Sequence, residues 1–136
     1  MPNNRFLAAG LAMAISAGVA AAHPPEGSAS PKFTHALPNV PGKSLVAVEV
    51  SYPPGGASLP HRHARSAFIY AYVLSGEIES QVGDSPARIY KAGESFYEEP
   101  GAHHRISRNA SATIPARLLA VFVLDTGDQP LTTPDK

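Results

Sequence analysis

The stretch Leu59-Pro60-His61-Arg62-His63 decides both the fold and the site that we expect in this chain. Side chains two residues apart on an extended strand point to the same side, so His61 and His63 can offer two imidazole nitrogens to one metal ion. A third histidine, His104, follows 41 residues after His63 in a second segment marked by glycine and proline. We therefore expect three histidines from two neighbouring strands to converge inside a small β-barrel.

Short apolar or alternating segments surround this stretch, and turn residues such as Pro53-Pro54-Gly55-Gly56 separate them. Regularly spaced short strands with turn signals between them predict an all-β sandwich or barrel. No stretch has helical periodicity, and there is no internal repeat. We expect strands over residues 45–52, 59–63, 67–74, 77–82, 87–90, 95–98, 103–107 and 117–124.

Strand alternation assigns the residues of the longest central segment to two faces. Ile69, Ala71 and Val73 are expected to point into the barrel, with Phe96 and Phe122 adding bulk to the interior. The other face of the same strand carries Phe68, Tyr70 and Tyr72, which we expect to pack against a second sheet or across a dimer contact.

Length and composition limit the protein classes that fit. The chain has 136 residues, which suits one domain with a single core. Basic and acidic side chains balance at 11 each, so no basic stripe favours nucleic acid. Cysteine is absent, which excludes disulfides, thiolate ligands and a cysteine nucleophile. Any metal site must therefore use nitrogen and oxygen ligands.

The first 22 residues have the pattern of a secretory signal peptide, with Arg5, an apolar alanine-rich core and small residues before a cleavage site near Ala22. We expect a periplasmic or secreted protein. No later apolar run is of membrane length, so no stable membrane anchor is expected after cleavage. The expected organisation is a signal peptide at 1–22, an extended arm at 23–44, the barrel domain at 45–126 and a C-terminal tail at 127–136.

Two glycine-marked motifs resemble those of the cupin family. Gly55, five residues, His61-x-His63 and then residues 72–76 resemble the first motif, and Gly93, seven residues, Gly101, two residues and His104 resemble the second. The resemblance covers residues 55–108. It implies a double-stranded β-helix, that is, a jelly-roll barrel, often dimeric, with a metal bound inside by histidines of both motifs. We accordingly expect a homodimer and a small-molecule ligand or substrate.

The sequence departs from the family pattern at one ligand position. Most cupins carry a glutamate seven residues before the glycine matched by Gly76, and here that position is Ile69. Only His61, His63 and His104 match the metal ligands. The chain looks like the three-histidine variants in the family, which include the cysteine dioxygenases and a diketone-cleaving dioxygenase.

Glu98 is the residue that could replace the missing carboxylate. If Phe96 and Glu98 both face the cavity, Glu98 is a fourth metal ligand, a group that orients a ligand or a bound water, or a catalytic base. The alternative is that Glu98 points to solvent together with Glu99. His103 alternates with His104 and is expected to face away, as are Arg62 and Arg105.

Three neutral imidazoles leave open positions on the metal for dioxygen or a chelating substrate. Iron(II) fits oxygen chemistry best, and zinc, manganese, nickel and copper remain open. We expect a dioxygenase-like enzyme that acts on a small apolar or aromatic chelating substrate. The alternatives are a metal- or ligand-binding module without turnover, and a metal-dependent isomerase that uses Glu98 as its base.

Overall fold

Eleven β-strands and their turns form residues 22–136, the part of the chain that the computed structural model describes. This part contains no helix, and therefore none of the length and apolarity that a membrane span requires. The predicted signal peptide falls almost wholly on residues 1–21, which lie outside the described residues, so export stays a prediction.

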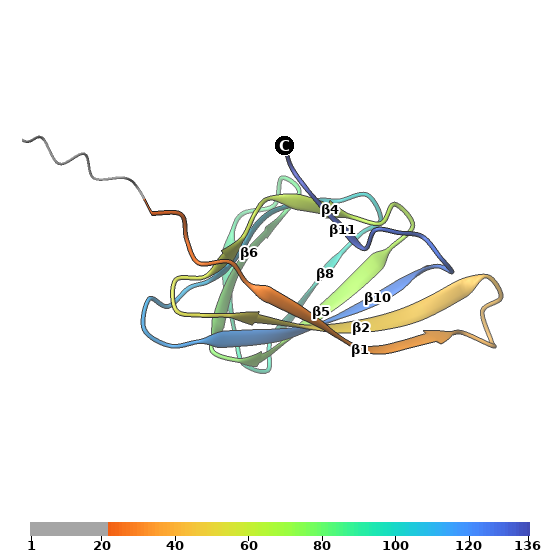
Figure 1. Cartoon of the computed structure of the whole chain (residues 1–136), viewed down its shortest axis with the longest axis horizontal. Helices are drawn as coiled ribbons and strands as arrows, with labels where there is room; N and C mark the ends of the chain where they lie inside the picture. Colours follow the sequence, from red (N-terminus) through yellow and green to blue (C-terminus); the bar gives the residue numbers. More distant parts are fainter. Residues whose placement is uncertain (1–21) are drawn as a thin grey trace, which may run out of the picture.

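The strands form two antiparallel sheets that face each other (Figure 1). We call the first the apolar sheet; it holds, in order, β1 (Ser28–Ala36), β2 (Lys43–Tyr52), β10 (Ala116–Asp125), β5 (Phe68–Ser75) and β8 (Ser95–Glu98). We call the second the histidine sheet; it holds β11 (Thr132–Pro134), β4 (His61–His63), β9 (His103–Asn109), β6 (Glu77–Val82) and β7 (Arg88–Lys91), and β3 (Ala57–Ser58) pairs with β9. This architecture confirms the predicted all-β jelly-roll barrel.

The interior is filled mainly by the apolar sheet, and its strands alternate as the sequence predicts. On β5, Ile69, Ala71 and Val73 are buried, whereas the side chains between them are exposed. Phe96 and Phe122 also belong to the core, from β8 and β10. The inner face of the histidine sheet is more polar, and this difference places the functional site.

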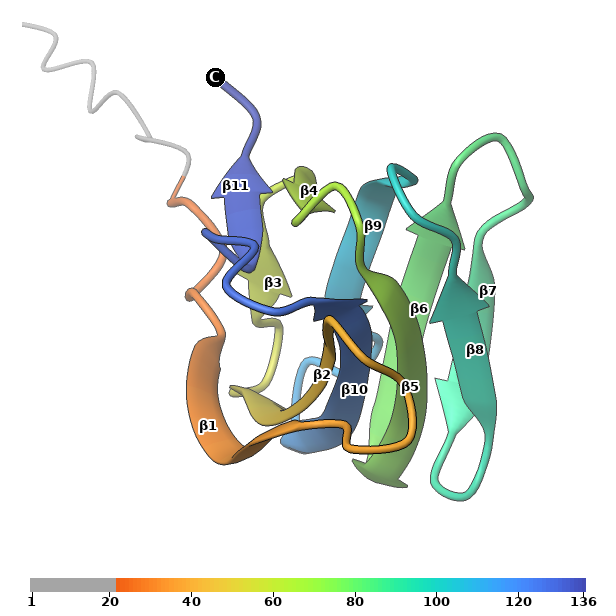
Figure 2. The same cartoon turned by 90° about the vertical axis from the view of Figure 1, so that its right-hand side faces the viewer.

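Both ends of the described chain have more strand structure than we expected. The segment predicted as an extended arm contains β1, which pairs with β2 along the edge of the apolar sheet. The predicted tail contains β11, which pairs with β4 and so with the strand of the two histidines. Figure 2 shows β1 at one end of the barrel and β7 and β8 at the other. Neither terminal strand has a strong apolar alternation that would reveal it in the sequence.

The turn between β5 and β6 depends on Gly76. Its φ is +70°, a backbone conformation that glycine adopts more readily than any other residue. A Cβ atom at this position would lie 2.5 Å from the carbonyl oxygen of Pro115 and 2.8 Å from Cα of Ala116. Backbone atoms cannot give way as a flexible side chain can, so the turn has no room for a larger residue.

We predict that Gly76→Ala lowers the free energy of unfolding by about 2–5 kcal/mol, from left-handed strain together with the backbone collision. Gly83→Ala is the matched control, because Gly83 also has a positive φ but has open space around its Cα. In the control, the free energy of unfolding should fall only by the cost of the left-handed strain, about 1–2 kcal/mol. Urea unfolding of both variants measures the difference, and equal losses would contradict the collision.

Candidate metal centre

The register of the histidine sheet brings the three predicted histidines together. His61 on β4 pairs directly with His104 on β9, and His63 lies two residues further along β4. Arg62, between them, points outward and donates to the carbonyl oxygen of Gly101. One nitrogen from each of the three rings lies within 4.8 Å of the other two. The convergence that we predicted from spacing is therefore present in the fold.

The His61 ring is oriented by a carbonyl of its own segment. Its Nδ1 lies 2.7 Å from the carbonyl oxygen of Leu59, and because that oxygen can only accept, Nδ1 carries the proton. Nε2 is then left with its lone pair. Burial lowers the pKa of His61 to about 4, with further lowering from the neighbouring histidines. The ring is neutral at physiological pH, as a metal ligand must be.

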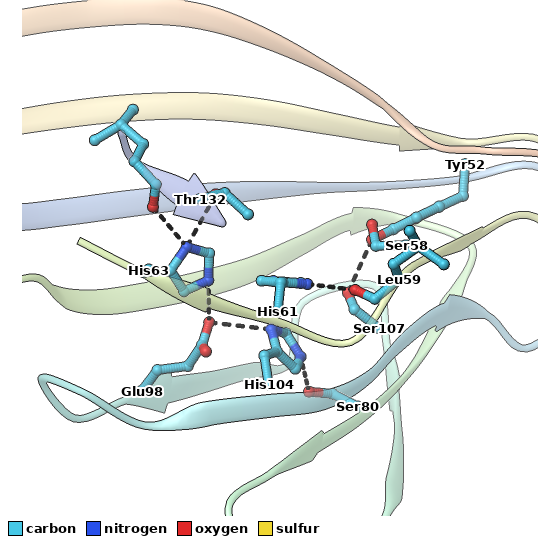
Figure 3. A network of polar contacts seen from close by, with 11 residues as sticks. Tyr52, Ser58, Leu59, His61, His63, Ser80, Glu98, His104, Ser107 and Thr132 are labelled. Atoms are coloured by element: carbon cyan, nitrogen blue, oxygen red, sulfur yellow. Dashed lines mark hydrogen bonds and ion pairs between the residues drawn. The ribbon is translucent and has the colours of Figure 1, made fainter. Parts of the chain in front are cut away.

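The His63 ring is fixed in the same way by β11. Its Nδ1 lies 3.1 Å from the carbonyl oxygen of Leu131 and 3.1 Å from Oγ1 of Thr132. The carbonyl requires a proton on Nδ1, so Nε2 faces inward and is the nitrogen available to a metal ion. That Nε2 lies 3.2 Å from Oε2 of Glu98, as Figure 3 shows.

The His104 ring is held by a serine of the neighbouring strand β6. Its Nε2 lies 2.9 Å from Oγ of Ser80, and its Nδ1 points to Glu98, 3.3 Å from Oε2. The contact with Oε2 does not have hydrogen-bond geometry, and Nδ1 is buried without a hydrogen-bond partner among the described residues.

Glu98 is the fourth member of the group. Its side chain is 3% exposed, so the interpretation that it points to solvent is wrong. On β8 it is the cross-strand partner of Ile69, the position where the usual cupin glutamate is missing. Burial raises the pKa of this carboxyl, but the side chains of His104 and His63 beside it outweigh burial and lower the pKa to about 2. Glu98 is therefore ionised.

These groups leave two buried polar atoms without a partner. Nε2 of His63, Nδ1 of His104 and Oε2 of Glu98 converge, and Nδ1 of His104 and Oε1 of Glu98 have no hydrogen-bond partner in the described part of the chain. Buried polar atoms without partners are costly, and a cation bound by the group removes the cost. Two nitrogens bound to one ion at about 2.1 Å lie at most about 4.2 Å apart, so small ring movements bring all three within range. The donor set fits a divalent metal ion.

A cavity of about 210 Å³ opens beside the group and is lined by all three histidines and Glu98. Its other walls include residues that the sequence did not single out: Tyr52, Ser58 and Ser107. Ser80 and Leu131, which orient two of the rings, were missed as well. Ser80 could have been found by alternation with the buried Ile78 of β6.

The residues expected to face away do so. His103 contacts Asp135 at 2.8 Å on the outer side of β9. Arg105 is exposed and pairs with Asp84 at 3.0 Å. Neither is brought to the metal group, which limits the candidate ligands to the three inward histidines and Glu98.

Comparison with solved structures agrees with this fold. Recombinant oxalate oxidase in complex with glycolate is 26% identical, with a TM-score of 0.56 over 66% of this chain and 45% of that chain. The TT1209 protein of Thermus thermophilus is 28% identical, with a TM-score of 0.57 over 73% and 84% of the two chains. A Klebsiella pneumoniae protein with a double-stranded β-helix domain, 22% identical over 79% and 85%, has a TM-score of 0.61 and shows the shared fold.

The chain spans less than half the length of the oxalate oxidase chain. No sequence among the curated proteins matches it. The sequence model described as the Cupin domain matches residues 48–122, which include every residue of both glycine-marked motifs and Glu98. The chain therefore belongs to the cupin family.

Proposed function

We propose that the protein is an exported metal-dependent cupin enzyme that binds one divalent ion through His61, His63 and His104. Iron(II) is the proposed metal, with zinc, manganese, nickel and copper as alternatives. The reaction proposed is oxidation of a small chelating substrate by dioxygen. The observation that carries the proposal is the convergence of three histidines on the buried Glu98, where Oε1 of Glu98 and Nδ1 of His104 have no hydrogen-bond partner among the described residues.

Each residue at this site has a distinct role in the proposal. Carbonyl oxygens of Leu59 and Leu131 accept hydrogen bonds from Nδ1 of two rings and turn their Nε2 atoms inward, and Ser80 holds the third ring. An iron(II) ion in this group supplies electrons and open coordination positions for a reaction between dioxygen and a chelating substrate. Glu98 adds one negative charge and acts as a fourth ligand or as the group that orients the others.

The cavity limits the substrate to a small molecule. A volume of about 210 Å³ lies below the usual range for drug-sized ligands, about 300–1,000 Å³. It is larger than the cavity of about 150 Å³ that holds benzene, so a single ring or a short chain fits. The related oxalate oxidase was solved with the substrate analogue glycolate, another small molecule with several oxygen atoms.

We propose in addition that two copies associate through the outer face of the apolar sheet. An aromatic patch made by Phe68, Tyr70, Tyr72, Leu74 and Tyr97 is between 37% and 59% exposed. Phe68 and Tyr97 stack at 5.8 Å within it. The patch has no charged side chain, so two copies related by a twofold axis can cover it without burying a charge.

Metal content is the direct test of the ligand set. His61→Ala, in protein purified without a tag, should lose most of the bound metal, because it removes one of three ligands. His103→Ala is the matched control, since His103 is one residue from a ligand and faces outward. Elemental analysis by mass spectrometry measures both. One ion per chain in His61→Ala would contradict the proposed centre.

Oxygen consumption tests the proposed reaction. Iron-loaded protein should consume dioxygen with at least one member of a panel of enolisable and catecholic compounds. If the protein binds one ion per chain but consumes no dioxygen with any of these compounds, the non-catalytic binding module is favoured. Glu98→Gln keeps the size of the side chain and removes its charge. Lost metal identifies Glu98 as a ligand, whereas lost turnover with metal retained supports a base and the isomerase alternative.

Light scattering coupled to size-exclusion chromatography tests the proposed dimer. The wild type should have twice the mass of one chain, and Tyr70→Arg, at the centre of the aromatic patch, should have the mass of one. Ile89→Arg is the control, because Ile89 is 49% exposed on β7 outside the patch. A monomeric wild type, or a dimer that survives Tyr70→Arg, would contradict this interface.

A further inference from the structure

The cavity contains a second polar group, a cluster of three hydroxyls from Tyr52, Ser58 and Ser107. Oη of Tyr52 lies 2.7 Å from Oγ of Ser58 and 2.8 Å from Oγ of Ser107. All three residues line the cavity beside the histidines. In Figure 3 the cluster lies on the opposite side of His61 from Glu98. None of these hydroxyls contacts a histidine, so the cluster is not needed to orient the metal ligands.

The cluster has more hydroxyl protons than hydrogen bonds between its members. Each of the three hydroxyls has one proton to donate, and the two contacts use two of them. No further side-chain hydrogen bond of these oxygens is found within residues 22–136. Burial raises the pKa of the Tyr52 phenol, so its proton stays on the oxygen. One donor therefore remains for a group inside the cavity.

The charges around the cavity define what this donor can meet. The lining includes two carboxylates, Glu26 and Glu98, and neither a lysine nor an arginine. A second negative group on a ligand would be desolvated at the hydroxyl end with no cation to balance it. A neutral acceptor, such as a ketone or amide oxygen, needs only the hydrogen bond. The hydroxyl end therefore discriminates between ligands of equal length by their charge.

We propose that Tyr52, Ser58 and Ser107 form a substrate-binding subsite that donates one hydrogen bond to a neutral oxygen of the ligand, whose anionic end lies at the three histidines. The inference rests on the proposed metal centre for the position of the anionic end. It identifies the substrate class as a short molecule with one metal-binding anionic group and one uncharged hydrogen-bond acceptor.

Strand geometry gives the approximate length of this ligand. Ser107 follows His104 by three residues on β9, and Ser58 precedes His61 by three, with Ser58 and Ser107 paired across the strands. Three residues of strand span about 10 Å. A metal bond of about 2 Å and a hydrogen bond of about 2.8 Å leave roughly 5 Å between the two polar ends. A chain of about five carbon atoms fits this distance and the cavity volume.

Three acyclic probes of equal carbon number separate the contributions of the two ends. Pentanoate has only the anionic end, 4-oxopentanoate adds a ketone, and glutarate replaces the ketone end by a second carboxylate. Their dissociation constants are to be measured by calorimetry on cobalt(II)-loaded protein. The wild type should bind 4-oxopentanoate about tenfold more tightly than pentanoate, and glutarate no more tightly than pentanoate.

The decisive variant removes all three hydroxyls, as Tyr52→Phe, Ser58→Ala and Ser107→Ala together. Because no partner is left unpaired, the triple variant should fold. Its preference for 4-oxopentanoate over pentanoate should fall to about onefold, with the affinity for pentanoate unchanged. The matched control is Ser44→Ala with Thr126→Val, which removes a hydroxyl pair at 2.7 Å outside the cavity and should keep the preference. If the triple variant unfolds, the wild-type affinities for 4-oxopentanoate and glutarate relative to pentanoate decide the proposal.

Each outcome decides the proposal. Equal affinities for 4-oxopentanoate and pentanoate in the wild type, a ratio that survives hydroxyl removal, or tightest binding of glutarate would overturn the subsite. If pentanoate binds and the ratio is about one, the subsite fails while the metal centre stands. If cobalt does not bind, the proposed metal centre is wrong, and the same ratios on metal-free protein decide the subsite. Binding of none of the probes to either form overturns it.

Discussion

The structure depends on a buried carboxylate that faces histidine nitrogens. Glu98 is ionised and lies 3.2 Å from Nε2 of His63, whose Nδ1 donates to the carbonyl oxygen of Leu131. A carboxylate oxygen and a ring nitrogen at this distance repel each other unless a proton or a cation lies between them. Because the interior lowers the dielectric screening, a charge here must be balanced more closely than at a surface. The buried Glu98 therefore requires a positive partner at the three histidines, the place where a divalent ion would bind.

The two sheets contribute different side chains, and apolar packing offsets the cost of burying the charged Glu98. Apolar packing comes mainly from β2, β5 and β10, which hold most of the buried aliphatic side chains. The inner face of the histidine sheet contributes polar groups instead, and nearly all of them are paired: His61 with Leu59, His104 with Ser80 and Ser107 with Tyr52. The two atoms that are buried without a hydrogen bond among the described residues, Oε1 of Glu98 and Nδ1 of His104, both belong to the group around the three histidines. An ion bound at that group would satisfy them.

Much of this could be predicted from the sequence, because strand alternation transfers directly to burial. The period of two placed Ile69, Ala71 and Val73 inside, and it placed His61 and His63 on one side of β4. Two glycine-marked motifs in the right order added the fold and the partner histidine, His104. Glu98 was open between inside and outside only because Glu99 follows it, and the β-strand periodicity favoured the inside.

The residues that were missed have different physical explanations. Alternation from His104 predicts that Ile106 points inward and Ser107 outward, but the pairing of β6 with β9 shifts register between Gln81 and Val82. An irregularity of this kind reverses the faces of the residues beyond it, so Ser107 is buried. The contribution of β11 was missed for another reason: three exposed residues after a loop have no periodicity to detect. Long-range pairing, which a local pattern does not encode, brings Leu131 to His63.

The position of the carboxylate also determines which side of the metal group is left open. Ile69 and Glu98 are cross-strand partners, so the barrel keeps one acidic group near this point but presents it from β8 instead of β5. From there Glu98 contacts His63 and His104, and no contact to His61 is found in the described part of the chain. The face beside His61 is consequently the one that Glu98 does not contact, and it borders the cavity. An anionic ligand meets less repulsion from Glu98 on that face, which is also the side where the hydroxyls of Tyr52 and Ser107 lie. The position of a single carboxylate on β8 thus fixes which side of the three histidines the cavity leaves free of contact with Glu98.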